Sequence, residues 1–215
     1  MDAGINKPGM AATDFAAIAP EDSGRAGFYA IIGRLFHAAP EADLIAQIAD
    51  SGNAGKDDGA DQAGGLALAW RDLQAACEKS RPDALQQEHA ALFIGVGKAQ
   101  VTPYTSGYVA HIAPDRHLVL LRQQLAAWGL ARHDMVFDSE DHISGLCDVM
   151  RFLIEKNQSL EIQKQFFEEF VQTGAMPFCD AVIAAGNAAF YRQVGVFSKA
   201  FFEVEKAAFD MLTPG

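Results

Sequence analysis

Carboxylates and an imidazole crowd one short stretch of this sequence, Asp138-Ser139-Glu140-Asp141-His142-Ile143. Such side chains can bind a metal ion, hold a cation or transfer protons. Neighbouring residues on a helix point about 100° apart, so Asp141 and His142 would not easily converge on one ion. The other histidines show no HExxH or similar spacing; they are His37, His89, His111, His117 and His133. We therefore expect no metal and no catalytic residues here. The plainer interpretation is that the acidic residues begin a helix, where they satisfy free N–H groups.

A two-glycine loop, Gly95-Val96-Gly97-Lys98, is the other stretch that could do chemistry. It suggests a nucleotide site, but phosphate-binding loops follow strands and this loop follows a helical pattern. Ser106 lies in Thr105-Ser106-Gly107 without the GxSxG elbow of a serine hydrolase. A nucleotide-binding hydrolase that combines residues 95–98 with the acidic cluster 138–142 stays open as an alternative function.

The elements that must position these residues are helices. Apolar residues recur at helical spacing, and no segment shows sustained period-two alternation. Ser23 is the candidate N-cap of the first helix, and a later helix that contains Phe170 is expected to end at Gly174. We predict an all-α protein, a single compact helical domain of about nine helices.

The domain is expected to span residues 23–215, after a flexible N-terminal segment 1–22. Residues 51–65 contain five glycines and no large apolar side chain, so we predict a disordered loop there. The stretch near 95–106 is the predicted hinge between an N-terminal and a C-terminal half.

Composition narrows the functional classes. The 215 residues carry 17 Lys and Arg against 28 Asp and Glu, a formal charge of -11, which argues against nucleic-acid binding. The cysteines Cys77, Cys147 and Cys179 form no CxxC pair and lie at helical spacing among apolar residues, so buried thiols are expected. The sequence shows neither a leader nor an apolar run of about 20 residues. We therefore expect a cytoplasmic protein without stable membrane insertion.

Four segments, in order, resemble the motifs of the TorD-like family of molybdoenzyme maturation chaperones. They read EHAALFIGVG at 88–97, PYTSGY at 103–108, EDHI at 140–143 and MPF at 176–178. The sequence departs from the family pattern at three places: Val96 replaces a common proline, His89 a tyrosine and Ala175 a tryptophan. Gly145 also interrupts the helix expected after His142, at a cost of about 1 kcal/mol relative to Ala.

The resemblance implies a chaperone rather than an enzyme, with no cofactor or metal of its own. It would bind the twin-arginine leader and the apo-form of the catalytic subunit of a molybdenum-containing oxidoreductase, and hold back export until the cofactor is inserted. The protein would be a monomer or a domain-swapped dimer. The expected leader-binding residues are Tyr104, Ser106, Tyr108, Glu140, Asp141 and His142.

Within this set, Glu140 and Asp141 are expected to take the arginines, because arginine and carboxylate can form bidentate pairs. Tyr104 and Tyr108 are expected to contact the apolar part of the leader, and His142 to orient a carboxylate or to hydrogen-bond the peptide backbone. A third hypothesis is a structural subunit of a helical assembly, which would show a large apolar interface instead of peptide affinity.

Overall fold

The computed structural model describes residues 18–51, 64–95, 99–109, 113–130 and 140–212. Within these ranges the chain is helical and contains no strand, which confirms the all-α prediction. The α-helices are α1 (Pro20–His37), α2 (Ala42–Asp50), α3 (Gly65–Lys79), α4 (Pro82–His89), α5 (Pro114–Ala127), α6 (Ile143–Glu155), α7 (Leu160–Phe166), α8 (Met176–Ala184) and α9 (Phe190–Met211). Two π-helical segments, η1 (Ala90–Ile94) and η3 (Phe167–Ala175), and one 3₁₀ turn, η2 (Thr105–Tyr108), complete the set.

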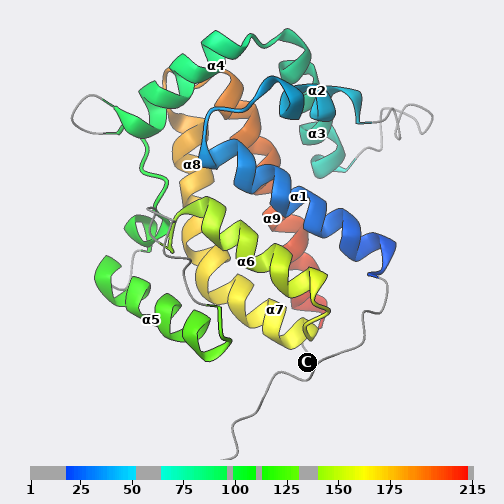
Figure 1. The fold of residues 1–215 in the computed structure, drawn as a ribbon, viewed down its shortest axis with the longest axis vertical. Helices are drawn as coiled ribbons and strands as arrows, with labels where there is room; N and C mark the ends of the chain where they lie inside the picture. Colours follow the sequence, from blue (N-terminus) through cyan, green and yellow to red (C-terminus); the bar gives the residue numbers. More distant parts are fainter. Residues whose placement is uncertain (1–17, 52–63, 96–98, 110–112, 131–139, 213–215) are drawn as a thin grey trace, which may run out of the picture.

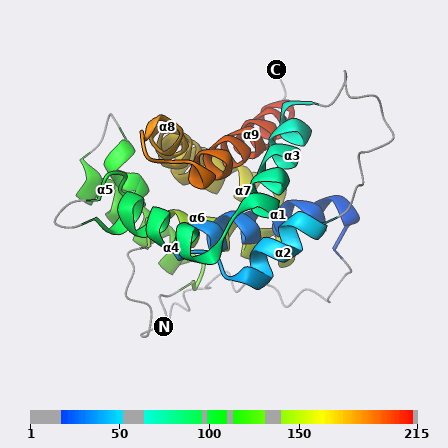
Figure 2. The same ribbon diagram turned by 90° about the horizontal axis from the view of Figure 1, so that it is seen from above.

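One packed pair of helices and one group of three organise the domain. The first helix α1 lies along α6, and the last helix α9 lies against α3 and α8 (Figures 1 and 2). Aromatic side chains fill the space between them: Phe28 of α1 meets Phe197 and Phe201 of α9 with ring centroids 5.2 and 5.4 Å apart. Each large apolar side chain removed from water in this way contributes roughly 1.5–3 kcal/mol. Apolar residues recur at helical spacing in the sequence because each helix buries one apolar face in this core.

The segment from Leu160 to Ala184 corrects a prediction. We expected a helix to end at Gly174, but α7, η3 and α8 follow one another without a break and Gly174 lies inside η3. A hydrogen bond in a π-helix spans one more residue than one in an α-helix, so the helix is wider there. The glycine serves a close contact, described below, and not a helix end.

The start of α1 also differs from the prediction. The helix begins at Pro20, three residues before Ser23, and Ala19 occupies the N-cap position. Proline suits the first turn, because it lacks only an N–H that has no partner there. Residues 20–22, assigned to the flexible segment, are therefore helical. Residues 1–17, most of the predicted loop and residues 96–98 of the predicted hinge lie outside the described residues.

Two further findings concern the three cysteines and the hydropathy of the helices. Cys77, Cys147 and Cys179 are buried and unpaired, as predicted. None of the helices in the described ranges combines the length and the hydropathy that a bilayer crossing requires.

Candidate functional site

Two of the four motif segments, 103–108 and 140–143, meet through their backbones. The Thr105 N–H donates to the Asp141 carbonyl at 2.8 Å, and the Ile143 N–H donates to the Pro103 carbonyl at 3.0 Å. Tyr104 and His142 thereby form an isolated antiparallel bridge. We call residues 103–108 together with 140–144 the polar junction. It joins the loop that follows η1 to the start of α6.

Asp141 faces the interior of the polar junction. Its side chain is 2% exposed, and the Ser106 hydroxyl donates to its carboxylate. The Thr105 hydroxyl donates to its backbone carbonyl at 2.9 Å. A buried carboxylate needs such partners, because leaving it unpaired costs more than leaving a neutral group unpaired. Asp141 therefore holds η2 in place, and only a small part of it reaches the surface.

The residue that caps α6 is His142, not one of the acids. Its Nδ1 accepts a hydrogen bond from the Ser144 N–H at 3.2 Å and lies 2.7 Å from the Ser144 hydroxyl. Its ring packs edge-on against Tyr104 and His37, with centroids 5.5 and 6.3 Å away. The plainer interpretation, in which acidic side chains cap this helix, therefore does not hold for Asp141. The imidazole does the capping and is itself 5% exposed.

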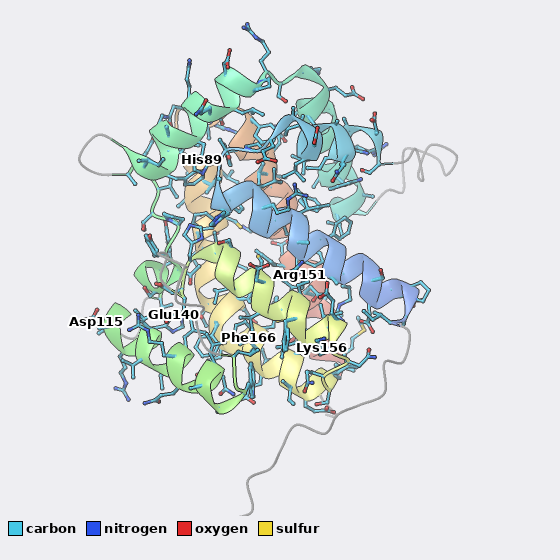
Figure 3. All side chains as sticks on the ribbon, viewed as in Figure 1. His89, Asp115, Glu140, Arg151, Lys156 and Phe166 are labelled. Carbon is cyan, nitrogen blue, oxygen red and sulfur yellow. The ribbon has the colours of Figure 1, made fainter. Side chains whose placement is uncertain are left out.

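Glu140 is the carboxylate of the polar junction that meets solvent. It forms an ion pair with Arg122 of α5, in which Nε and a terminal guanidinium nitrogen each lie 3.0 Å from Oε2. The hydrogen bond that Arg122 donates to Glu140 raises the pKa of Arg122. Figure 3 shows Glu140 beside α5. Because half of the Arg122 side chain is exposed, the pair is screened by water and weak.

The two tyrosines of the polar junction differ in exposure. Tyr104 is 37% exposed and its ring lies at the surface. The Tyr108 hydroxyl donates to the Thr102 carbonyl at 2.9 Å, and its ring packs edge-on against Phe178. Burial raises the pKa of Tyr108 to about 12. Tyr108 therefore anchors the loop, whereas more than a third of Tyr104 is exposed.

Two glycines allow the polar junction to form. A Cβ at Gly174 would lie 2.8 Å from Thr105 Cβ and 2.9 Å from the Thr105 carbonyl oxygen, so only glycine lets η3 approach η2 this closely. A Cβ at Gly145 would lie 3.1 Å from the Glu140 carbonyl oxygen. The glycine that interrupts α6 in the sequence thus makes room for the chain that carries Glu140.

Glu88 was quoted in a motif but given no role, and the structure supplies one. Its carboxylate accepts hydrogen bonds from the N–H groups of Ala189, Phe190 and Tyr191 at 2.8, 3.1 and 2.8 Å. It therefore caps the first turn of α9 from another helix. The only signal for this role in the sequence was the position of Glu88 at the head of the motif, because a cap from 101 residues away leaves no local pattern.

The components of the alternative hydrolase are only partly described. Asp138 and residues 96–98 lie outside the described residues, and Gly95 follows the π-helical η1 instead of a strand. Within the described residues, no three His, Cys, Asp or Glu side chains are grouped closely enough to hold a metal ion. No specific contact favours the hydrolase.

Comparison with known families identifies the class of protein. The family model described as nitrate reductase delta subunit matches residues 60–180, which is more than half of the chain and includes the whole polar junction. None of the curated proteins matches the chain. The chain belongs to the nitrate reductase delta subunit family, whose members are TorD-like chaperones for the maturation of molybdoenzymes.

Proposed function

We propose that this chain acts in the cytoplasm on the catalytic subunit of a molybdopterin-dependent oxidoreductase. It binds the twin-arginine leader and the apo-form, assists cofactor insertion and holds back export until insertion is complete. The observation that supports this most is the polar junction. Its backbone pairing joins two of the motif segments and places an exposed aromatic ring, Tyr104, near a carboxylate, Glu140, that is 15% exposed and pairs with a half-exposed arginine.

Glu140 is the residue that receives a leader arginine. It already pairs with a guanidinium, that of Arg122, so an incoming arginine can replace Arg122 and leave the carboxylate satisfied. The exchange costs little, because an exposed ion pair contributes about 0–1 kcal/mol. A leader arginine that pairs bidentately with the carboxylate gains more than it displaces.

The other five residues of the proposed site divide by exposure. Tyr104 contacts the apolar part of the leader, because its ring is at the surface. Ser106, Asp141 and His142 are buried and position the chain on which Tyr104 and Glu140 lie. Tyr108 is part-buried and holds the loop through Thr102. This assigns Asp141 a positioning role and leaves direct contact with arginine mainly to Glu140.

The test is titration of a fluorescent twin-arginine leader peptide against the full chain. Glu140→Gln removes a charge-assisted bond and should weaken binding by about 1.5–3 kcal/mol, roughly 10–100-fold. Glu155→Gln, an exposed acid at the far end of α6, is the matched control and should change little. Affinity should also fall as salt is raised, since the charges are screened.

The variant Arg122→Gln distinguishes replacement of Arg122 by a leader arginine from long-range attraction between the leader and the acidic protein. Because Arg122 competes for Glu140, its removal should tighten leader binding. Arg116→Gln, another exposed arginine on α5, changes the net charge by the same amount and controls for long-range attraction. Equal affinities for the Glu140 and Glu155 variants, or for the Arg122 and Arg116 variants, would show that the leader is held elsewhere.

A further inference from the structure

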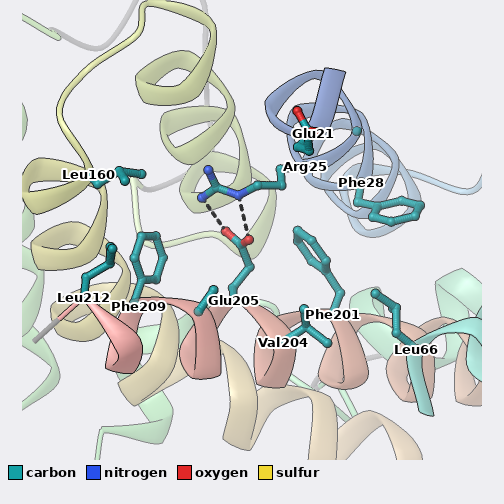
Figure 4. Close-up of a pocket in the computed structure, with 12 residues that line it drawn as sticks. Glu21, Arg25, Phe28, Leu66, Leu160, Phe201, Val204, Glu205, Phe209 and Leu212 are labelled. Atoms are coloured by element: carbon teal, nitrogen blue, oxygen red, sulfur yellow. Dashed lines mark hydrogen bonds and ion pairs between the residues drawn. The ribbon is translucent and has the colours of Figure 1, made fainter. Parts of the chain in front are cut away.

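A second surface lies at the opposite end of α1 from the polar junction. A groove of about 410 Å³ opens between the start of α1, the end of α9 and the start of α7 (Figure 4). Its volume falls within the range of roughly 300–1,000 Å³ that is typical of ligand sites. Its walls are apolar and include Phe28, Phe201 and Phe209. We call it the α1–α9 groove.

The floor of the α1–α9 groove is an ion pair that the protein has already satisfied. The Arg25 guanidinium donates to both oxygens of Glu205, at 2.7 and 2.9 Å. Tyr29 donates to the same carboxylate at 3.1 Å, and Asp22 pairs with the remaining side of Arg25 at 2.7 Å. Glu205 is buried. These charges fix α1 to α9 and leave no cation of the floor without a carboxylate.

The rim of the α1–α9 groove is unusual in its exposed apolar side chains. Leu160, Val204 and Leu212 are each between 43% and 48% exposed. They are three of the eight large apolar side chains that are exposed within the described residues, and all three line this one groove. Figure 4 shows Val204 on one side and Leu160 with Leu212 on the other. Large apolar side chains that gather in this way mark an interaction site more often than scattered ones do.

We infer that the α1–α9 groove docks a basic amphipathic α-helix of a partner protein. The walls are side chains of helices, and no strand edge lines the groove, so an extended peptide would find no backbone partners there. A helix satisfies its own backbone groups and presents only an apolar face, which the rim and walls of the groove can cover.

The charges around the α1–α9 groove indicate that the docked helix is basic. The lining residues carry two carboxylates, Glu21 and Glu205, against one guanidinium, Arg25, and Asp22 adds a third carboxylate beside it. Glu21 is exposed at the groove. The local excess of negative charge has the sign of the whole chain, which carries a formal charge of -11. Such a rim attracts basic flanking residues and repels an anionic membrane surface.

The α1–α9 groove is separate from the proposed leader site. His37, which packs on His142, and Arg25 are 12 positions apart on α1, or about 18 Å along the helix axis. A variant in the groove can therefore be tested for its own effect, and the inference does not depend on leader binding at the polar junction.

The experiment uses a fluorescent model helix of leucine and lysine, about 18 residues long with apolar residues at helical spacing. The full chain should bind it, and Val204→Lys should weaken binding at least about tenfold. Val119→Lys on α5 is the matched control, because Val119 is also 48% exposed and the net charge of the two variants is equal. The same peptide with glutamate in place of lysine should bind much more weakly than the lysine form.

Glu21→Gln should weaken binding severalfold, whereas Asp83→Asn, an acid in the first turn of α4, should not. The inference is overturned if the lysine peptide does not bind, if both lysine variants bind it equally, or if the glutamate peptide binds as well. It is also overturned if sedimentation shows a dimer of this chain that Val204→Lys dissociates, since the groove is then a contact between copies. Unchanged leader affinity in Val204→Lys is expected and keeps the two sites distinct.

Discussion

The polar junction and the α1–α9 groove are built in opposite ways. In the polar junction, the side chains of Ser106 and Asp141 are buried and hydrogen-bond each other, and the buried His142 is hydrogen-bonded to Ser144. The ring of Tyr104 and part of the Glu140 carboxylate face outward. In the groove, one ion pair lies beneath apolar side chains that are left exposed at the rim. Buried polar groups that satisfy one another fix a unique geometry, whereas exposed apolar groups supply binding energy. The comparison therefore predicts directional recognition at one end of α1 and adaptable apolar contact at the other.

The largest loss of stability should come from breaking the ion pair at the floor of the α1–α9 groove. Glu205→Gln removes the buried partner of Arg25, and the free energy of unfolding should fall by about 3 kcal/mol, at the lower end for buried pairs because Arg25 keeps some exposure. Asp180→Asn, which breaks the surface pair with Lys199, should change it by less than about 1 kcal/mol. Urea denaturation measures both. Similar losses would mean that Glu205 contributes no more than a surface charge.

Gly174→Ala tests the close approach behind the polar junction. The added methyl group would overlap Thr105, so the free energy of unfolding should fall by roughly 1–3 kcal/mol. Gly27→Ala in α1 meets no atom within 4 Å and should raise it by about 0.5–1 kcal/mol. A Gly174 variant as stable as the native chain would show that η2 and η3 can separate freely.

Ser106→Ala tests the buried network itself. It takes one donor from the Asp141 carboxylate, and the free energy of unfolding should fall by about 1–2 kcal/mol. Ser198→Ala also removes a buried hydroxyl, but that hydroxyl donates to the Val194 carbonyl within its own helix, so its loss should cost little. Leader affinity should fall only for the Ser106 variant. Equal stability of the two variants would contradict a network that holds η2.

The smallest effect concerns pH. Burial lowers the pKa of His89 below its usual 6.5, so between the two pKa values the unfolded chain binds more protons than the folded one. The free energy of unfolding should therefore decrease as pH falls below about 6.5. His89→Phe should reduce this slope, as measured by urea denaturation at several pH values. His37→Phe is the comparison, and a slope that only this second variant changes would exclude His89 as the cause.

The helices could be predicted from sequence because burial imposes a local period. Phe28, Ile32, Leu35 and Phe36 are spaced for one face of α1, and all four contribute to the core. The start of α1 could not be placed as well, because Pro20 and Ser23 are both good first-turn signals and the structure uses the proline. The end expected at Gly174 failed for a different reason. Glycine marks helix ends and close contacts alike, and sequence alone does not separate them.

The sequence places the candidate residues in segments that the structure joins, but it does not give the contacts that each residue makes. Asp141 reads as a helix-capping acid, yet its carboxylate turns to Ser106, which lies 35 residues earlier in the chain. The pairing of Pro103 and Thr105 with the chain around His142 involves single hydrogen bonds between distant segments, which leave no periodic pattern. The cap that Glu88 places on α9 spans a larger gap of 101 residues. Long-range polar contacts depend on the completed fold, so their residues can be recognised long before their partners can.

The ion pair between Arg25 and Glu205 has a consequence for folding during translation. Its two residues are separated by 180 positions, and a ribosome adds about 5–20 residues per second. Arg25 therefore waits roughly 10–35 s after its own synthesis before its partner exists. Throughout that time the apolar faces of α1 and α3 lack the cover of α9. While it is being translated, this chaperone therefore exposes apolar surfaces, as an incompletely folded client protein does.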